Sequence, residues 1–310
     1  MNADWPLVTI GIPTYNRAEA TLPITLESAL DQDYPNIEIV VSDNCSSDNT
    51  EQVISGYKDT RINYIRQNVN IGPTNNYKAC LDNCRGDYFL LLHDDDLIDR
   101  DFISSCMAGV GHRTTFGLIR TGTRMMDAAG KTITEKPNTM SSNEPEDLYR
   151  SWLTGDTSFY LCSTLYNTKA LRAAGGFKSK NNLFEDGIAI IKISHQWPIL
   201  NIPELKASFR QHEEQRTHAA AAKRWSEDFK QAIDLIYSYN PKDRDNLYRI
   251  GMERYAKVSL HFARKIKNPI QRVIAMFCLC NHFPYTYWPG KSLKLFLIGY
   301  LGTKFYGKSV

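Results

Sequence analysis

The feature that most restricts the fold of this chain is the regular alternation of apolar strands and amphipathic helices over its first hundred residues. The first strand segment is a continuous run of apolar and β-branched residues, typical of strands buried on both faces of a parallel sheet. Such strands are predicted at residues 7–12, 37–41, 62–66 and 88–92, with helices at 17–30, at 75–84 and in a short segment ending near 56. Because this alternation requires right-handed crossovers, it predicts an α/β fold around a mostly parallel sheet flanked by helices.

The pattern changes near residue 116. Residues 117–126 and 131–134 flank the turn Asp127-Ala128-Ala129-Gly130, which indicates a hairpin. Further strands are predicted at 158–166 and 203–210, with helices at 169–174 and 184–195. Beyond residue 219 the pattern is helical, with segments at 219–239, 244–265, 269–280 and 292–305. We therefore divide the chain into an α/β domain, residues 1–218, and a helical C-terminal extension, residues 219–310.

Polar side chains follow three of the predicted strands, at residues 14–17, 43–48 and 94–96. In α/β folds the carboxyl ends of parallel strands form the edge where ligands bind. Asp94, Asp95 and Asp96 repel one another, and a divalent cation is their natural counter-charge. Oxygen ligands favour Mg²⁺ or Mn²⁺, often together with the phosphates of a substrate. The alternative is a solvated acidic loop that caps a helix beginning near residue 100.

Other candidate residues have structural alternatives. Asp43 directly follows a strand, where its carboxylate can accept hydrogen bonds from a nucleotide base or ribose. Asp48 is better explained as a helix cap. Glu185 and Asp186 enter a helix, where acidic residues also interact favourably with the helix dipole. His212, taken alone, is better explained as a loop histidine with its hydrogen bonds satisfied.

Five short motifs occur in a fixed order along the chain. They are Val8-Thr9-Ile10-Gly11-Ile12-Pro13-Thr14-Tyr15-Asn16-Arg17, Ser42-Asp43-Asn44 with Ser47-Asp48-Asn49-Thr50, Asn68-Val69-Asn70-Ile71-Gly72, Asp94-Asp95-Asp96, and Gly175-Gly176-Phe177 before Glu185-Asp186. In combination they resemble family 2 glycosyltransferases of the GT-A fold, over about residues 5–218. The resemblance implies a Rossmann-like domain that takes one sugar from a nucleotide-sugar donor, with a UDP-sugar favoured, and inverts the anomeric centre.

The resemblance also implies roles for individual residues. Contacts to the nucleotide sugar would come from Pro13, Tyr15, Asn16, Arg17, Asp43, Arg66 and Asn76, together with Asp94, Asp95 and Arg210. A Mn²⁺ or Mg²⁺ ion under the diphosphate would be held by Asp96, Asp94 and His212. Asp186, paired with Glu185, matches the general base, and Arg210 or His212 matches a late motif that closes over the metal and the diphosphate. These roles suit the chemistry, since a diphosphate leaving group needs cations and an acceptor hydroxyl needs a carboxylate.

Two positions depart from the family pattern. His93 stands where many relatives have an acidic residue, which leaves open which member of the triplet binds the metal. Ala221 precedes Arg224-Trp225 where processive synthases have glutamine, so we expect one sugar to be added rather than a polymer. Two other functions stay open: a nucleotidyltransferase, although residues 14–17 are not the glycine-rich loop it would need, and a non-catalytic nucleotide-sugar sensor or scaffold.

The net charge of +3 hides an uneven distribution. Residues 1–253 carry 34 acidic and 27 basic residues, a net charge of −7, whereas residues 254–310 carry ten basic residues, eleven aromatic ones and no acidic one. Basic and aromatic helices suit an anionic membrane surface. The alternative is a helical bundle that packs on the α/β domain with its lysines solvated. No segment resembles a base-reading module, so nucleic acid is not an expected partner.

Cysteine usage and hydropathy indicate the compartment. The seven cysteines are odd in number and lack both a disulfide framework and zinc-site spacing, which favours a reducing environment. The first residues lack the pattern of a signal peptide, and no apolar stretch reaches the roughly 20 residues of a spanning helix. We therefore expect a cytoplasmic protein, peripheral on the inner face of the cytoplasmic membrane, whose acceptor is a lipid-diphosphate-linked saccharide of surface-polysaccharide assembly.

Overall fold

The computed structural model describes residues 5–140, 142–211 and 222–265. Its strands are β1 (Val8–Thr14), β2 (Ile37–Asp43), β3 (Ile62–Arg66), β4 (Tyr88–Leu91), β5 (Leu97–Ile98), β6 (Leu118–Met126), β7 (Thr132–Lys136), β8 (Thr164–Asn167) and β9 (Ile199–Arg210). Its helices are α1 (Leu22–Leu30), α2 (Thr50–Gly56), α3 (Pro73–Asp82), α4 (Phe102–Gly109), α5 (Pro145–Thr154), α6 (Thr168–Ala173), α7 (Glu185–Gln196), α9 (Ala222–Ser238) and α10 (Arg244–Lys265).

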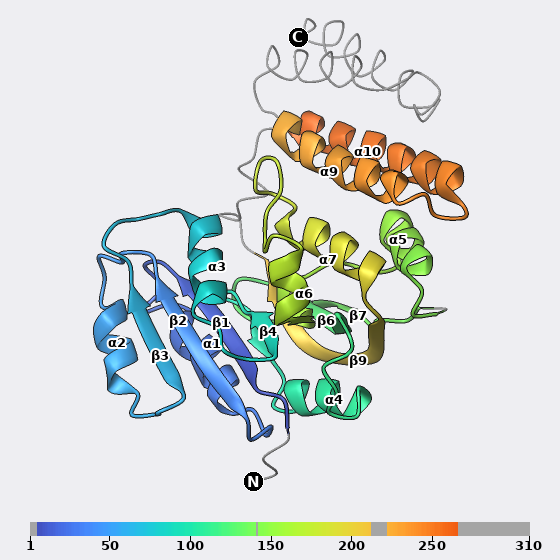
Figure 1. Cartoon of the computed structure of the whole chain (residues 1–310). Helices are drawn as coiled ribbons and strands as arrows, with labels where there is room; N and C mark the ends of the chain where they lie inside the picture. Colours follow the sequence, from blue (N-terminus) through green and yellow to red (C-terminus); the bar gives the residue numbers. More distant parts are fainter. Residues whose placement is uncertain (1–4, 141, 212–221, 266–310) are drawn as a thin grey trace, which may run out of the picture.

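The strands form one sheet with helices on its faces (Figure 1). Their order is β3-β2-β1-β4-β8-β6-β9-β5, and β7 pairs with β6 beside this path. The first four strands in this order are parallel, and so are β6 and β9. β8 is antiparallel to both of its neighbours, β4 and β6. The predicted α/β fold with a mostly parallel sheet is confirmed.

The first half of the chain follows the sequence pattern closely. All residues of β1, β2 and β4 are buried, as the continuous apolar runs predict. The expectation that β1 stops before Pro13 is wrong, because the strand continues to Thr14. The carbonyl of Gly11 accepts a hydrogen bond from the β4 side, from the Leu92 N–H, and Pro13 faces the same side beyond the last residue of β4. Its missing N–H therefore removes no hydrogen bond from the sheet.

The prediction that the first helix starts near residue 17 is also wrong. α1 begins at Leu22, and residues 17–21 form turns instead. The N–H groups of Ala20 and Leu22 both donate to the carbonyl of Arg17, and the N–H of Ala18 donates to Asp48. The hydrogen bond from Ala18 to Asp48 connects the loop after β1 to the loop after β2.

The second half departs further from the prediction. The hairpin of β6 and β7 is confirmed, as is the end of α6 at Gly175 and Gly176, both of which have positive φ. A strand over 158–166 is wrong in extent, because residues 161–163 form a 3₁₀ turn and only Thr164–Asn167 pairs with the sheet. The helix α5 and the two-residue strand β5 were not predicted.

The sheet separates two apolar clusters, and alternate residues of β4 enter opposite ones. Tyr88 and Leu90 pack in one cluster with residues of α1 and α4. Phe89 and Leu91 pack in the other with residues of α3, α5, α6 and α7. Because both faces are covered, the exposed polar groups of the parallel strands concentrate at the strand ends.

The helices α9 and α10 lie side by side and next to α5 and α7 (Figure 1). Phe229 and Ile233 of α9 and Leu247 and Tyr255 of α10 are buried in the same cluster as α7. The predicted boundary at residue 218, the helices predicted at 269–280 and 292–305, and most of the basic aromatic tail lie outside the described residues. Within the described part of the chain, no helix combines the length and the apolar character needed to cross a membrane.

Candidate active site

A cavity of about 700 Å³ opens at the carboxyl ends of β1 and β4. The first turns of α3 and α7, together with residues of α5 and α9, complete its walls. The predicted site residues that line it are Pro13, Tyr15, Arg17, Asn76, Asp94, Asp95, Glu185 and Asp186. The predicted residues outside its lining are Asn16, Asp43, Arg66, Asp96 and Arg210, and His212 lies outside the described residues. Asn44 and Asn70 also line the cavity, so residues from all five motifs meet in one place.

The acidic triplet follows β4 directly, and its first carboxylate faces the end of β1. Asp94 Oδ2 accepts a hydrogen bond from the N–H of Tyr15 at 3.3 Å. Burial and then the charge of Asp95 raise the pKa of Asp94 to about 6, against the opposing charge of Arg17. A carboxyl group with a raised pKa gains from any cation that binds beside it.

Asp96 is the buried member of the triplet, with 1% of its surface exposed. Its Oδ1 accepts a hydrogen bond from the backbone N–H of Arg210 at 2.9 Å, and the thiol of Cys162 is a further partner. Burial, followed by the charge of Asp95, raises the pKa of Asp96 well above its ordinary range. Asp96 is thus held from β9 and from the 3₁₀ turn before β8.

One group of side chains in the described residues has the spacing of a metal site. Potential ligand atoms of His93, Asp95 and Asp96 all lie within 4.8 Å of one another. The Nδ1 of His93 is 3.9 Å from Asp96 Oδ2. Two carboxylates and one imidazole form a donor set that fits a divalent ion such as Mn²⁺. His93 is not among the metal ligands predicted from the sequence, although its position directly before the triplet was the available signal.

The second pair of carboxylates lies on the first turn of α7. Glu185 is buried, and its Oε1 accepts the hydroxyl hydrogen of Thr74 on α3 at 3.0 Å. Asp186 is half-buried and lines the cavity. Burial raises the pKa of Tyr160, and the charges of Asp186 and Asp96 add to this effect. Tyr160 therefore lies within electrostatic range of both carboxylates.

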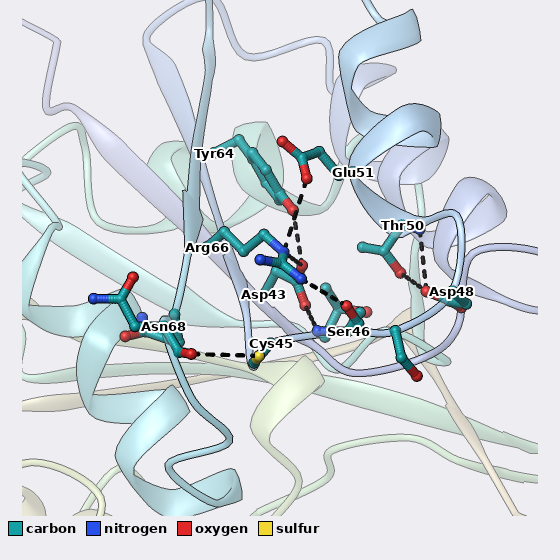
Figure 2. A network of polar contacts seen from close by, with 12 residues as sticks. Asp43, Cys45, Ser46, Asp48, Thr50, Glu51, Tyr64, Arg66 and Asn68 are labelled. Atoms are coloured by element: carbon teal, nitrogen blue, oxygen red, sulfur yellow. Dashed lines mark hydrogen bonds and ion pairs between the residues drawn. The ribbon is translucent and has the colours of Figure 1, made fainter.

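Asp43 and Arg66 organise the loop after β2 (Figure 2). Asp43 is fully buried, and its two oxygens accept hydrogen bonds from the Ser46 N–H at 2.9 Å and from the Tyr64 hydroxyl at 2.8 Å. Arg66 Nε lies 3.6 Å from Asp43, and the guanidinium also donates to the Ser46 carbonyl at 2.9 Å. The next residue, Asn44, lines the cavity in place of Asp43.

Three more predicted residues connect neighbouring elements. Asn16 accepts a hydrogen bond from the Ser47 N–H at 2.8 Å. Asn76 donates to the Ser42 carbonyl at 2.8 Å and also lines the cavity. The guanidinium of Arg210 donates to the carbonyls of Asp95 and Ala128, at 2.8 and 3.0 Å.

Asp48 has the structural role that the sequence favours. Its carboxylate accepts hydrogen bonds from the N–H of Thr50, the first residue of α2, at 3.1 Å and from the N–H of Ala18 at 3.0 Å. The N-cap residue of α2 is Asn49, so Asp48 binds the first N–H of the helix from one position before the cap.

Aromatic side chains that were not predicted as site residues form the cavity wall away from the triplet. Trp152 of α5 stacks on Phe159 with ring centroids 4.9 Å apart, and Trp225 of α9 lies edge-on to Phe184 at 5.0 Å. All four line the cavity. Nothing in the sequence pattern places these four side chains together, so only the fold could bring them to one wall. The wall is suited to an apolar or ring-shaped part of a ligand.

Comparison with known proteins agrees with this arrangement. The family model "Glycosyl transferase family 2" matches residues 9–173, just over half of the chain. The match includes the acidic triplet but ends before Glu185 and Asp186. A curated relative, the GalNAc(5)-diNAcBac-PP-undecaprenol beta-1,3-glucosyltransferase of Campylobacter jejuni, is 32% identical over 147 residues, which cover 45% of this chain. The matched part spans 47% of that relative, about half of its length.

Solved structures show the same fold at low sequence identity. Residues 1–349 of S. aureus TarS, in complex with UDP-GlcNAc, superpose with a TM-score of 0.71 at 17% identity, covering 91% of this chain and 82% of that one. The mannosyltransferase PcManGT from Pyrobaculum calidifontis, in complex with GDP-Man and Mn²⁺, gives a TM-score of 0.57 at 17% identity, covering 98% and 88%. Because the family match covers more than half of the chain, the chain belongs to glycosyl transferase family 2, and its fold is that of the solved glycosyltransferase structures.

Proposed function

We propose that the protein transfers one sugar from a nucleotide-sugar donor to a hydroxyl group of a saccharide acceptor, with inversion at the anomeric carbon. The observation that carries this proposal is that carboxylates from two separate parts of the chain line the same cavity. Asp94 and Asp95 lie at the sheet edge, and Asp186 lines the same cavity from α7. One group suits the diphosphate of a donor, and the other suits the acceptor hydroxyl.

The donor is a UDP-sugar in this proposal. Pro13 and Tyr15 lie at the end of β1, and Tyr15 is exposed at the rim of the cavity, where its ring can stack on a base. Arg17 adds a positive charge near Asp94, where a diphosphate would lie. Asn44 and Asn76 supply amide groups on the same side. The UDP-GlcNAc complex of TarS supports this choice of nucleotide.

The proposed metal is Mn²⁺ or Mg²⁺, held by the acidic triplet. We assign Asp96 and Asp95 to the ion together with His93, and keep Asp94 and His212 as the further ligands that the sequence predicts. A bound divalent cation would stabilise the negative charge that develops on the departing diphosphate. The Mn²⁺ complex of the archaeal mannosyltransferase supports the assignment. Arg210 acts here by positioning Asp95 and Asp96 through its hydrogen bonds.

Asp186 is the proposed general base. The acceptor oxygen attacks the anomeric carbon, the bond from that carbon to the diphosphate oxygen breaks, and the hydroxyl proton moves to the Asp186 carboxylate. A single displacement of this kind inverts the configuration. Glu185 is already engaged with Thr74, so we assign it to holding α7 against α3.

The acceptor is a saccharide carried on a lipid diphosphate, in the assembly of a bacterial surface polysaccharide. The name of the Campylobacter relative, which specifies an undecaprenol-linked acceptor, supports this choice. The ten basic and eleven aromatic residues after Glu253 would bring the enzyme to the anionic inner face of the cytoplasmic membrane.

A thermal-shift panel tests the proposal. UDP-, GDP-, TDP- and CMP-sugars are added with and without Mn²⁺, because a ligand that binds the folded state raises the melting temperature. We expect a UDP-sugar to stabilise the protein most, and only with the metal present. Equal stabilisation with and without Mn²⁺, or none by any nucleotide sugar, would contradict it.

A further inference from the structure

The loop that leads into α7, residues 178–184, is held by one face of α9. The Lys180 N–H donates to Gln231 Oε1 at 2.9 Å, and the side-chain amide of Asn181 donates to the Arg224 carbonyl at 3.2 Å. Lys180 also forms an ion pair with Glu227 at 3.4 Å. Positions 224, 227, 228 and 231 have the spacing of one helix face. The loop and α9 therefore behave as one packed unit.

Asp228 lies at the centre of this contact and is fully buried. Its Oδ1 accepts hydrogen bonds from the backbone N–H of Asn181 at 2.7 Å and from the side chain of the same residue at 2.8 Å. Its Oδ2 accepts from the Ser179 hydroxyl at 2.5 Å and from the Leu183 N–H at 3.0 Å. All four donors are uncharged. A buried carboxylate is expensive to desolvate, and these bonds offset that cost only with the loop in this conformation.

The hydrogen bonds continue from Asp228 to the start of α7. Ser179 Oγ accepts from the N–H groups of Leu183 and Phe184, each at 3.1 Å. Asn182, which lies between Ser179 and Leu183 in the chain, has a φ of 56°. This left-handed conformation costs energy in a residue with a side chain. Residues 182–184 line the cavity, and Glu185 and Asp186 follow them directly.

We propose that Asp228 is a positioning residue, which sets the proposed base Asp186 and the loop 182–184 against the donor side of the cavity. The inference rests on the proposed function, and it concerns a residue of α9, beyond the end of the family match at residue 173. Glycosyl transfer needs the base and the anomeric carbon aligned closely, and a shift of about 1 Å can cost on the order of 100-fold in rate. In this proposal α9 is needed for the correct placement of the base.

The central variant is Asp228→Asn. An amide keeps the shape of the side chain but has one acceptor oxygen, so its NH₂ group would face the Leu183 N–H. The matched control is Asp234→Asn, also on α9, which removes only an exposed ion pair with Lys230. Ser179→Ala is the second variant, because it removes the hydroxyl that holds Leu183 and Phe184 and leaves the buried carboxylate in place.

Three measurements are made on the full chain. Hydrogen exchange follows the amides of Leu183 and Phe184, calorimetry gives the Kd for UDP with Mn²⁺, and initial rates give kcat and the donor KM. The rates use the UDP-sugar chosen by the thermal-shift panel and p-nitrophenyl glycosides as acceptors. For Asp228→Asn we expect at least about tenfold faster exchange, a Kd and donor KM within about twofold of wild type, and a kcat lower by on the order of 100-fold. Asp234→Asn should match wild type.

A wild-type kcat in Asp228→Asn, or a UDP affinity that falls as far as kcat, would overturn the inference. If Asp228→Asn does not fold, Ser179→Ala decides: faster exchange with a lower kcat supports the positioning role, and faster exchange with a wild-type kcat refutes it. Failure of the proposed function gives a different result, since wild type would then transfer no sugar from any nucleotide sugar, and failure of the base role alone would leave Asp186→Asn at the wild-type rate.

Discussion

The backbone N–H of Arg210 donates a hydrogen bond to Oδ1 of Asp96 at 2.9 Å, so the last residue of β9 holds the last carboxylate of the acidic triplet. The two residues are 114 positions apart in the sequence. Arg210 also donates from its guanidinium to the carbonyl of Asp95. The geometry of the triplet therefore depends on a strand from the other end of the α/β domain.

Asp96→Asn tests the metal site. The amide oxygen can still accept the hydrogen bond from Arg210, so the backbone stays in place while the charge is lost. We expect UDP binding in the presence of Mn²⁺ to weaken at least about tenfold, with binding in EDTA unchanged. Calorimetry measures both, with Asp82→Asn on the exposed side of α3 as the control. If Mn²⁺-dependent affinity is the same in both variants, the triplet does not hold the metal.

Asp186→Asn tests the base. The amide cannot take the acceptor proton, so kcat for transfer should fall by about 10²- to 10⁴-fold. Affinity for UDP should stay close to that of wild type, because the donor contacts lie on the β1 side of the cavity. Initial-rate kinetics and calorimetry give the two values. A variant that loses nucleotide binding and turnover together would place Asp186 in the donor site instead.

Gly11→Ala tests the packing of β1, whose carboxyl end forms the proposed donor side of the cavity. A Cβ at residue 11 would lie 2.6 Å from the ring of Phe89 and 2.9 Å from Cys80 Cβ, both fully buried. Relief of this overlap requires a shift of β1 or of the core, and we expect a loss of about 1–3 kcal/mol in the free energy of unfolding. Gly56→Ala is the matched control, because no atom lies within 4 Å of its Cβ position. Urea denaturation should show no loss for the control.

Glu38 gives a pH-dependent contribution to stability. Burial favours its neutral form, but hydrogen bonds from Thr9 and Arg85 outweigh this effect and hold the pKa of Glu38 below its ordinary value. A lowered pKa in the folded state stabilises the protein above the ordinary glutamate pKa, and this contribution is lost as the pH falls through the lowered pKa. Wild type should therefore exceed Glu38→Gln in unfolding free energy near pH 7, and the difference should shrink in acid. A constant difference at all pH values would contradict the assignment.

The basic tail is tested by flotation with phosphatidylglycerol vesicles. The full chain is compared with a variant that ends at Lys265, which retains α10 and its buried residues. We expect the full chain to float with the vesicles at low salt and the shorter one to stay behind, because the shorter one lacks six of the ten basic residues. Equal flotation of the two proteins would remove the tail from membrane binding.

The sequence pattern could predict the elements whose residues all face the core. β2 and β4, which are buried throughout, appear nearly where their apolar runs lie, since such runs are compatible with few other local structures. The partly exposed β3 also lies at its predicted residues. α5 was missed, although Pro145 at its first turn and Gly155 in the left-handed conformation after it are the usual signals of a helix start and stop. Residues 158–163 are apolar enough for a strand, but tertiary packing winds three of them into a 3₁₀ turn.

In the candidate site, too, some residues could be predicted from the local sequence and others only from the fold. The residues that follow a strand in sequence, such as Asp94 and Tyr15, could be placed at the cavity from the strand pattern alone. The contact of Asp43 with the half-buried Tyr64 and the aromatic wall around Trp152 depend on contacts between distant segments. Asp228 belongs to the second kind, because its role depends on a loop that precedes it by more than forty residues.

The central claim is that the triplet, at the donor diphosphate, and Asp186, at the acceptor hydroxyl, act together in one inverting displacement. Proton NMR of the sugar formed first from a UDP-α-sugar, in the presence of Mn²⁺, tests this most directly. The account predicts the β-anomer as the first product with wild type and no product above background with Asp186→Asn. The α-anomer as first product, or an unchanged rate with Asp186→Asn, would contradict it.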